Sequence, residues 1–322
     1  MALTVHVDTS FPREAEALLA SGLGHHTVLR PARPTTSNLA PAAASDPVEA
    51  DVAFGQPSVH ALAASPRVRW VHLTSAGYTR YAEPAVRDEL ARRGVMLTTS
   101  SSVYAEPCAT HAMALVLALL RQLPAAMAEQ SGRRAWPATE LRSRSRVLSG
   151  AVVLLLGLGA IGRRLSELLA PWGADVVAFR SRVRGDEPVR TVDASGLTAE
   201  LARADVVISS LPQAAGTVGL LDRERIAAMK PGAIFVNVGR GTTVDQSALE
   251  AALASGRLGG VGLDVTDPEP LPADHPLWSS ARCVITPHTA GGRFDEHTRL
   301  VAHFVQNLER YERGVPLVDR VI

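Results

Sequence analysis

Several polar residues in the second half of the chain have the types and spacing needed for chemistry. Arg240, Asp264 and His288 each lie near the end of a segment that reads as a buried strand, and Glu269 stands in the acidic, proline-rich run behind Asp264. Ligands of open α/β sheets bind at the carboxyl ends of the strands, so these side chains are expected at one edge of a sheet. A guanidinium holds anions, and an imidazole exchanges protons near neutral pH. The pattern therefore suits an anionic substrate and a proton transfer.

Each of these residues also has an ordinary structural interpretation. Arg240 could be a surface arginine at the start of a helix, and His288, one of ten histidines, could be structural. Glu269 competes with Asp267 for a role in the site, and either carboxylate could cap a turn. Asp264 could serve folding only.

A glycine-rich turn between a buried strand and a helix predicts a dinucleotide site. An apolar run leads into Gly157, Gly159 and Gly162, in the spacing Gly-x-Gly-x-x-Gly. The first glycine allows a tight turn, the second a close approach of the backbone to a pyrophosphate, and the third close packing of the helix on the strand. Because the amides at the helix start face the pyrophosphate, Ala160 and Ile161 also belong to the expected cofactor site. Ordinary packing is the alternative role of such a turn.

The end of the second strand of this sheet bears on the choice between NAD and NADP. An NAD enzyme usually carries an acidic residue there, which binds the ribose hydroxyls. This chain has Arg180, Ser181 and Arg182 instead, and these side chains could hold a 2′-phosphate through charge-assisted hydrogen bonds. We therefore expect NADP rather than NAD as the cofactor; the alternative is a solvated basic loop.

The elements that must position these residues alternate between strands and helices, which predicts parallel βαβ units and an α/β fold. From Gly150 onward the alternation is regular. It predicts six strands, at residues 151–156, 175–179, 206–210, 233–238, 260–265 and 284–286. Six strands in this order make a complete doubly wound parallel sheet of Rossmann type.

The part of the chain before Gly150 is less regular. Predicted strands lie at residues 3–7, 51–54, 68–73 and 95–98, and predicted helices at 12–20, 84–93 and 107–120. Residues 30–57 are rich in Pro, Ala and Ser and allow little regular structure apart from the one strand. Residues 133–146 are polar and basic, which indicates a surface connection. A last helix over 294–314 lies beyond the second sheet and could return to the first domain.

Size and charge narrow the class of protein. With 322 residues, of which 46% are hydrophobic, the chain suits two globular domains. A formal net charge of +1 gives no electrostatic case for a partner that is nucleic acid or a membrane surface. The apolar stretch at residues 112–120 is too short to span a bilayer and predicts a core helix.

The cysteines and the first residues bear on location. Cys108 and Cys283 stand far apart and fit neither a disulfide framework nor a metal-ligand spacing. The amino-terminal residues lack the basic leader and apolar stretch of a secretory signal. We therefore expect a reducing, cytoplasmic location and no bound metal.

The motifs, in their order along the chain, resemble the D-isomer-specific 2-hydroxyacid dehydrogenase family. They are Gly-x-Gly-x-x-Gly from Gly157, Asn-x-x-Arg-Gly from Asn237, Leu-Asp-Val and then Pro-Glu-Pro-Leu-Pro after Leu263, and Thr-Pro-His from Thr286. The Pro-Glu-Pro-Leu-Pro run is similar to that of glyoxylate/hydroxypyruvate reductases in particular. The likeness covers nearly the whole chain and is weakest over residues 1–65.

The resemblance implies both an architecture and a reaction. Residues 1–103 with 288–322 would form a flavodoxin-like substrate domain, and residues 104–287 the dinucleotide-binding domain, through which two copies would associate as a homodimer. The implied reaction is hydride transfer between NAD(P)H and a small 2-oxo acid, which gives a D-2-hydroxy acid.

The resemblance also implies a role for each polar residue. Arg240 would bind the substrate carboxylate and carbonyl, His288 would be the acid–base group, and Glu269 would hydrogen-bond and orient His288. Asp264 would contact the nicotinamide end or support the other three. As hydride reaches the 2-carbon, negative charge grows on the carbonyl oxygen; Arg240 would stabilise that charge and His288 would neutralise it with a proton.

Further binding positions follow from the same resemblance. A turn of small residues would bind the substrate carboxylate through its backbone amides: Ser75, Ala76 and Gly77. The further cofactor-binding positions are Leu211, Pro212, Thr217, Val238, Asp264, His288 and Gly291. An ordinary turn or loop is the alternative for the substrate turn and for residues 211–217.

Some positions depart from the family pattern and leave the substrate open. The segment Ser100-Ser101-Ser102-Val103-Tyr104 matches a connection in which the family usually has Asn and Gly, but Ser replaces them here, and Thr110 stands where an acidic residue is common. A dehydrogenase for a bulkier 2-oxo acid is therefore one alternative, and a dinucleotide-sensing, corepressor-like binding protein without turnover is another. Trp136 could lie near a neighbouring subunit's site or serve only surface packing.

Overall fold

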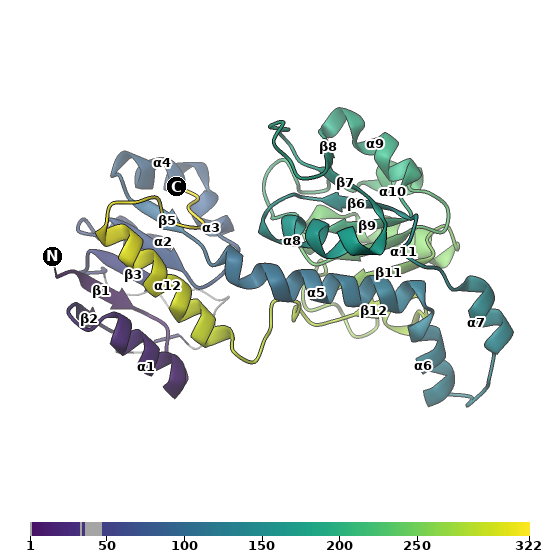
Figure 1. Cartoon of the computed structure of the whole chain (residues 1–322), viewed down its shortest axis with the longest axis horizontal. Helices are drawn as coiled ribbons and strands as arrows, with labels where there is room; N and C mark the ends of the chain where they lie inside the picture. Colours follow the sequence, from purple (N-terminus) through teal and green to yellow (C-terminus); the bar gives the residue numbers. More distant parts are fainter. Residues whose placement is uncertain (1, 33, 36–46) are drawn as a thin grey trace. The chain divides into compact units, whose positions relative to one another are not determined.

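The computed structural model describes residues 2–32, 34–35 and 47–322. Its contacts divide the chain into two compact units, which Figure 1 shows. Unit 1 comprises Met1–Tyr104 and Arg293–Ile322, and unit 2 comprises Ala105–Gly292. The boundaries predicted from the sequence, after residues 103 and 287, lie one and five residues earlier along the chain.

Unit 2, all of whose residues are described, contains a seven-stranded parallel sheet in the order β12-β11-β10-β9-β6-β7-β8. The strands are β6 (Val152–Leu156), β7 (Asp175–Phe179), β8 (Arg190–Val192), β9 (Val206–Ser209), β10 (Ile234–Asn237), β11 (Gly260–Leu263) and β12 (Cys283–Ile285). All six predicted strands are present, and the Rossmann-type expectation is confirmed. The seventh strand, β8, was missed because three residues at a sheet edge carry too little hydrophobic pattern.

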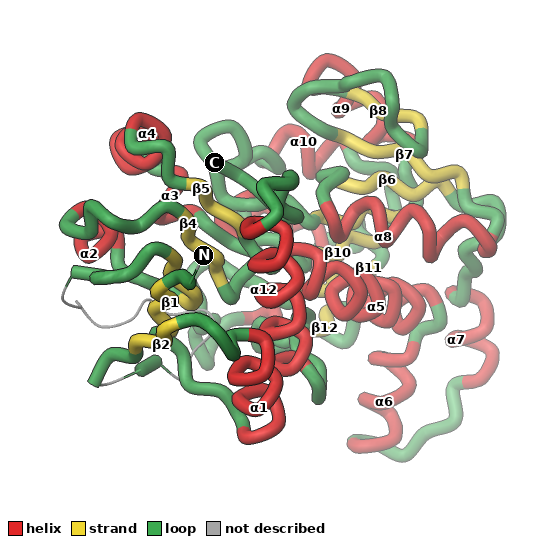
Figure 2. Tube along the Cα trace, turned by 60° about the vertical axis from the view of Figure 1, so that its left-hand side comes forward, coloured by secondary structure: helices red, strands yellow, loops and turns green. Residues whose placement is uncertain are grey.

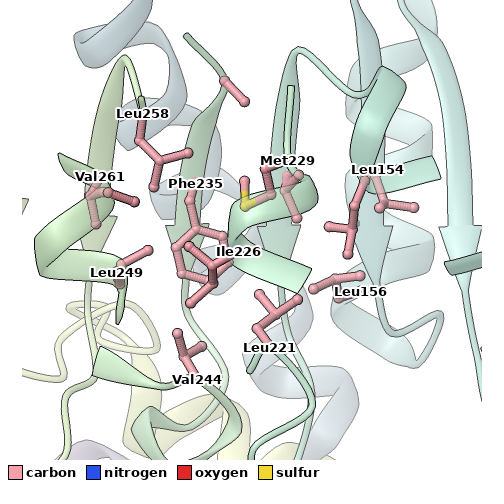
Figure 3. Close-up of a cluster of buried hydrophobic side chains, with 14 of the residues drawn as sticks. Leu154, Leu156, Leu221, Ile226, Met229, Phe235, Val244, Leu249, Leu258 and Val261 are labelled. Carbon is pink, nitrogen blue, oxygen red and sulfur yellow. The ribbon is translucent and has the colours of Figure 1, made fainter. Parts of the chain in front are cut away.

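Apolar side chains on both faces hold this sheet between helices. The helical segments are α8 (Ala160–Leu169), η1 (Ala170–Trp172), α9 (Ala194–Arg203), α10 (Arg223–Ala228), η2 (Gly241–Thr243), α11 (Gln246–Ala254) and η3 (Pro276–Ser279). Figure 3 shows one face, where Leu154 of β6, Phe235 of β10 and Val261 of β11 meet Ile226 of α10 and Leu249 of α11. Strands buried on both faces are nearly continuous apolar runs, which is why the sequence predicted them well.

The long helix α5 (Ser101–Leu120) begins six residues before the predicted start at Pro107, which lies inside it. Asp319 explains the early start, because its carboxylate accepts hydrogen bonds from the backbone N–H (2.7 Å) and the hydroxyl (2.9 Å) of Ser102. The first backbone N–H groups of a helix have no partner within the helix, and the bond to Asp319 satisfies that of Ser102. The prediction was wrong at this end because the capping residue comes from elsewhere in the chain.

Helix α5 is also longer than the apolar stretch noted in the sequence. Among the described residues it is the one helix with the length and composition to cross a membrane, and 56% of its most apolar 18-residue stretch is buried inside the protein. Its second half packs on β11, where glycines make room for it: a Cβ on Gly260 or Gly262 would press on Leu119 or Leu115. This contact is that of a core helix.

Residues 123–147 form an arm at the end of α5, and residues 133–146, which the sequence indicated as a surface connection, lie within it. The arm contains α6 (Leu123–Ser131) and α7 (Ala138–Arg144), joined by a link that carries Trp136. Figures 1 and 2 show both helices beside the end of α5 and away from the sheet of unit 2. No residue of either helix is buried, and neither helix was predicted from the sequence.

Unit 1 has a five-stranded parallel sheet in the order β2-β1-β3-β4-β5, the order of flavodoxin-like folds. The strands are β1 (Thr4–Val7), β2 (Thr27–Leu29), β3 (Val52–Gly55), β4 (Trp70–Leu73) and β5 (Met96–Thr98). The helices are α1 (Arg13–Gly22), α2 (Val59–Ala63), α3 (Thr79–Ala82), α4 (Pro84–Arg92) and α12 (Glu296–Glu312). The short elements β2, α2 and α3 were not predicted, and residues 36–46 of the Pro-, Ala- and Ser-rich segment lie outside the described residues.

The last helix returns to unit 1, as the sequence suggested. Helix α12 lies beside α1, as Figures 1 and 2 both show. Its Phe304 stacks on Phe54 of β3, with 4.1 Å between ring centroids. Beyond it, residues 319–322 run antiparallel to β5: Val321 donates to the Leu97 carbonyl at 2.8 Å, and Thr99 to the Asp319 carbonyl at 3.0 Å.

Candidate active site

Three neighbouring strands of unit 2 end at one edge of the sheet, and a predicted site residue follows each of them. Arg240 follows β10, Asp264 follows β11 and His288 follows β12. The backbones are joined there, because the Asp264 N–H donates to the Asn237 carbonyl and the His288 N–H to the Asp264 carbonyl, both at 2.9 Å. The parallel topology thus brings together segments that lie far apart in the sequence.

Glu269 and His288 are in direct contact. Nδ1 of His288 lies 2.6 Å from Oε1 of Glu269, and the two side chains are 31% and 43% exposed. A carboxylate accepts hydrogen bonds and does not donate them, so Nδ1 carries the proton of this bond. Nε2 has no hydrogen-bond partner among the described residues. The ring is therefore held on one side and open on the other, which suits proton transfer through Nε2.

Asp264 fixes the turn that carries His288. Its carboxylate is buried and accepts from the Thr286 hydroxyl (2.6 Å) and from the backbone N–H groups of Thr289 (2.9 Å) and Ala290 (3.0 Å). The backbone of His288 has a φ of +52°, the left-handed conformation that residues other than glycine rarely adopt. Such a conformation persists only where the surroundings enforce it, and Asp264 supplies that enforcement.

Arg240 is held through its backbone. The side chains of Asn237 (3.0 Å) and Thr243 (2.7 Å) donate to its carbonyl, and its guanidinium donates to the Gly239 carbonyl at 2.6 Å. Burial lowers the pKa of the Arg240 side chain, and the nearby charge of Glu269 opposes that shift. Arginine remains protonated in proteins even so. The edge of the sheet therefore keeps a cation near the histidine–glutamate pair.

The glycine-rich turn has the geometry that a dinucleotide needs. Gly157 has a φ of +100°, and a Cβ on Gly162 would collide with the Gly157 carbonyl, so α8 packs tightly against the turn. A Cβ on Gly159 would meet nothing within 4 Å. That open backbone precedes Ala160 and Ile161, the first residues of α8, whose amides can face a pyrophosphate. The residues present therefore fit the cofactor.

The basic residues after β7 are not equivalent. Arg180 pairs with Glu187 at 3.1 Å, whereas Ser181 and Arg182 are exposed. Glu187 also accepts from the backbone N–H groups of Arg184 (2.7 Å) and Gly185 (2.8 Å). This carboxylate was not among the residues predicted from the sequence; it orders the loop and compensates the charge of Arg180. Arg182 and Ser181 are thus the better placed of the three for a 2′-phosphate.

The other predicted cofactor positions surround the same edge of the sheet. Leu211 and Pro212 follow β9, and Thr217 closes their loop: its hydroxyl donates to the Pro212 carbonyl at 2.6 Å. Val238 is buried directly after β10, and Gly291 lies in the turn behind His288. All of these segments lie at carboxyl ends of strands, where the glycine-rich turn also lies.

In unit 1, the predicted substrate turn follows β4. The backbone N–H groups of Ser75, Ala76 and Gly77 have no acceptor among the described residues. Consecutive open amides of this kind form an anion-binding nest, and the small side chains leave them accessible. The turn can therefore bind a carboxylate.

Sequence reasoning missed His111 as well. Its Nε2 lies 2.9 Å from the Thr286 hydroxyl and 3.7 Å from Oδ1 of Asp264. The sequence feature that could have revealed it is the position of this polar ring in the otherwise apolar second half of α5. His111 thus supports the turn of His288 from the helix side.

One group of possible metal ligands occurs among the described residues: His25, His26 and Glu312 in unit 1. The Leu3 N–H donates to Nδ1 of His26 at 3.1 Å, so the proton of the neutral ring is on Nε2. Nε2 therefore carries a proton and is not available as a metal ligand, and it lies 3.5 Å from Glu312 without forming a hydrogen bond.

Comparison with known proteins agrees with this geometry. The profile described as "D-isomer specific 2-hydroxyacid dehydrogenase, NAD binding domain" matches residues 113–290. Glyoxylate reductase/hydroxypyruvate reductase of Homo sapiens is 32% identical over 234 residues, which cover 71% of each chain. D-3-phosphoglycerate dehydrogenase of Mycobacterium bovis is 34% identical over 242 residues, 74% of this chain but 44% of the relative.

A solved structure gives the same result for the fold. The NADPH-dependent glyoxylate/hydroxypyruvate reductase of Sinorhizobium meliloti, in complex with NADP and sulfate, superposes with a TM-score of 0.80. Its sequence is 26% identical, and the match covers 99% of this chain and 98% of that chain. The similarity therefore extends over both units of the chain.

Proposed function

The chain belongs to the D-isomer specific 2-hydroxyacid dehydrogenase family, whose members are NAD(P)-dependent enzymes, and from this premise we propose that it reduces glyoxylate or hydroxypyruvate to the corresponding 2-hydroxy acid. The observation that carries the proposal is the contact of His288 with Glu269 beside Arg240 at the cofactor edge of the sheet. The relatives named for glyoxylate and hydroxypyruvate reduction favour these two substrates.

In the proposed mechanism, the bound nicotinamide supplies the hydride that forms the new C–H bond at the 2-carbon. The Arg240 guanidinium binds the substrate and stabilises the charge that grows on the carbonyl oxygen. His288 then gives that oxygen a proton from Nε2, while Glu269 keeps the ring in place through Nδ1. Hydride and proton together convert the 2-oxo acid into a 2-hydroxy acid. We assign the open amides of Ser75, Ala76 and Gly77 to the substrate carboxylate.

The experiment is a panel of 2-oxo acids tested with purified protein and both reduced cofactors. Steady oxidation of NADPH with glyoxylate or hydroxypyruvate would support the proposal. Turnover of branched or aryl 2-oxo acids alone would favour the dehydrogenase for bulkier substrates. Tight dinucleotide binding without turnover of any acid would favour a corepressor-like binding protein.

For the cofactor we propose NADP over NAD. Exposed Ser181 and Arg182 follow β7, and a 2′-phosphate fits this pair better than the ribose hydroxyls of NAD do. The Sinorhizobium meliloti reductase is described as NADPH-dependent, which agrees with this choice. A kcat/KM for NADH above that for NADPH would contradict it.

We further propose a homodimer that forms through the arm of residues 123–147. The arm has a cavity of about 680 Å³ between α6 and α7, lined largely by apolar groups. Trp136 is 93% exposed there, and Met127 is also exposed. Exposed apolar surface of this kind marks protein–protein contacts. Light scattering should give about twice the chain mass of 34.1 kDa; a monomer at every concentration would contradict the dimer.

We also propose a cytoplasmic location. Both cysteines are free thiols, and burial raises the pKa of Cys283 to about 12, so that this thiol is unreactive at neutral pH. A protein without disulfides suits a reducing compartment. Recovery of the protein in a membrane or secreted fraction of its own cells would contradict this assignment.

A further inference from the structure

We propose that Gln56 is a positioning residue, which sets the conformation of the turn Thr74–Gly77 and thereby governs how tightly the protein binds the carboxylate of a 2-oxo acid. The inference rests on the proposed function, since it concerns the turn that we assign to that carboxylate. Gln56 was not among the residues that the sequence singled out.

The side chain of Gln56 reaches the turn from the neighbouring strand. Gln56 follows β3 and the turn follows β4, and these strands pair in parallel register. Nε2 of Gln56 donates to the hydroxyl of Thr74 at 3.0 Å and to that of Ser75 at 2.9 Å. The carboxamide nitrogen carries two hydrogens and can therefore serve both hydroxyl groups. All three residues are buried, so water does not compete for these bonds.

The bond from Gln56 to Ser75 also affects the end of the turn, because it sets the direction in which the Ser75 hydroxyl donates. Because the Ser75 hydroxyl accepts from Gln56, its own hydrogen is free to donate, and it does so to the Gly77 carbonyl at 2.7 Å. The carbonyl at the end of the turn is therefore engaged inside the protein. The N–H groups of Ser75, Ala76 and Gly77 remain without an acceptor among the described residues. Gln56 thus orients the hydroxyl that engages the Gly77 carbonyl, while the three N–H groups are left for a ligand.

The backbone of Gln56 is fixed as well. Its N–H donates to both carboxylate oxygens of Asp8, at 2.9 and 3.1 Å. The preceding Gly55 has a φ of +139°, and a Cβ there would collide with the Asp8 carboxylate, so the chain approaches Asp8 as closely as only glycine allows. Gln56 is therefore tied at its backbone to β1 and at its side chain to the turn, and it can hold the turn in one conformation.

The test compares Gln56→Met, which keeps the length of the side chain and removes the carboxamide, with a matched control. Asn307 is another buried carboxamide of unit 1, bonded to both backbone groups of Val318 and not to the turn. Asn307→Leu therefore measures what the loss of a buried amide does to the fold alone. The readouts are KM and kcat for glyoxylate, KM for NADPH, and the Kd of oxalate by calorimetry with NADPH present.

We expect Gln56→Met to raise both the KM for glyoxylate and the Kd of oxalate by about 10-fold or more, because the N–H groups of a displaced turn no longer point at the carboxylate. The kcat and the KM for NADPH should stay within about twofold of wild type, since the chemistry and the cofactor site are untouched. Asn307→Leu should lower stability and leave all of these constants unchanged. Unaltered oxalate binding by folded Gln56→Met protein would overturn the proposal.

Two further outcomes are also decisive. If Gln56→Met does not fold, Thr74→Val removes one acceptor of the Gln56 amide in an isosteric side chain, and it should raise the same two constants by a smaller factor. If wild-type protein reduces no 2-oxo acid, the proposed function fails, while oxalate binding still tests Gln56. Absence of oxalate binding to wild type would overturn the positioning role together with the assignment of the turn.

Discussion

At the scale of single residues, the proposed reaction depends on the orientation of one imidazole. Glu269 engages Nδ1 of His288, and the buried carboxylate of Asp264 fixes the turn on which the ring stands. Together these contacts fix the position of the ring and leave Nε2 open. Preorganisation of this kind lowers the cost of reaching the transition state.

Replacement of His288 by Ala should lower kcat for 2-oxo acid reduction by at least about 100-fold, because no other group then supplies the proton. Steady-state rates with NADPH are the measurement. The control is His60→Ala, which removes an exposed histidine on α2 and should leave the rate unchanged. Near-normal turnover by folded His288→Ala protein would exclude the acid–base role.

The cofactor loop gives a second prediction at this scale. Arg182→Ala should raise the KM for NADPH by about 10-fold and leave the KM for NADH unchanged, because only NADPH carries the 2′-phosphate. Arg184→Ala, an exposed arginine of the same loop, is the matched control. Equal effects of Arg182→Ala on the two cofactors would place the 2′-phosphate elsewhere.

The sequence predicted some of these residues and missed others for a physical reason. Arg240, Asp264 and His288 follow strands, and parallel topology makes the ends of neighbouring strands adjacent, so the motifs pointed to one site. Gln56 and Glu187 act through contacts that no periodicity records. Gln56 donates to hydroxyl groups that follow the neighbouring strand β4, and Glu187 pairs with Arg180 across a loop. Their roles become visible only when the partners are placed in space.

At the scale of elements, helix α5 shows how distant residues set an element boundary. The apolar pattern predicted its second half, but its first turn depends on Asp319, 217 residues further along the chain. The short edge strands β2 and β8 escaped prediction for a related reason, since their pairing and not their composition makes them strands. Local pattern thus predicted the buried elements better than the peripheral ones.

Asp319→Asn should test this cap. Asn tolerates the left-handed backbone found at Asp319 (φ +57°) but lacks the charge, so unfolding at neutral pH should cost about 1 kcal/mol less than in wild type. Denaturant unfolding of the two proteins is the measurement.

The pH dependence of that difference has a definite sign. Burial alone would raise the pKa of Asp319, but hydrogen bonds from His303 and Ser102 outweigh it, and the net pKa lies below 3.8. A depressed carboxyl pKa contributes stability above the unfolded value that is lost as pH falls through the folded value. The gap between wild type and Asp319→Asn should therefore narrow below pH 3.8; a constant gap would argue against the charged cap.

At the scale of the whole molecule, Asp8 should make folding stability fall as pH rises. Burial raises the pKa of Asp8 to about 6, although hydrogen bonds from Gln56 and Thr9 and the charge of Arg80 oppose the shift. With a raised folded-state pKa, the stabilising contribution is fully present below the unfolded value of 3.8 and is lost as pH rises through 6. The protein thus bears the cost of an ionised, buried carboxylate at neutral pH.

Asp8→Asn removes that cost while its amide oxygen can still accept from Gln56. The variant should be more stable than wild type above pH 6, by up to about 3 kcal/mol, and should show no advantage below pH 4. Thermal or urea unfolding across pH 4 to 8 is the measurement. Equal stability of the two proteins at pH 8 would mean that the ionised carboxylate is not penalised.

The antiparallel run of residues 319–322 beside β5 has a consequence for solubility. β5 ends the strand order of unit 1, so its outer side would otherwise offer unsatisfied main-chain groups to other molecules. The tail occupies them, since Leu97 and Thr99 bond to it instead. Removal of residues 320–322, which leaves the Asp319 cap of α5 in place, should therefore expose the outer edge of β5 and make the protein prone to aggregation.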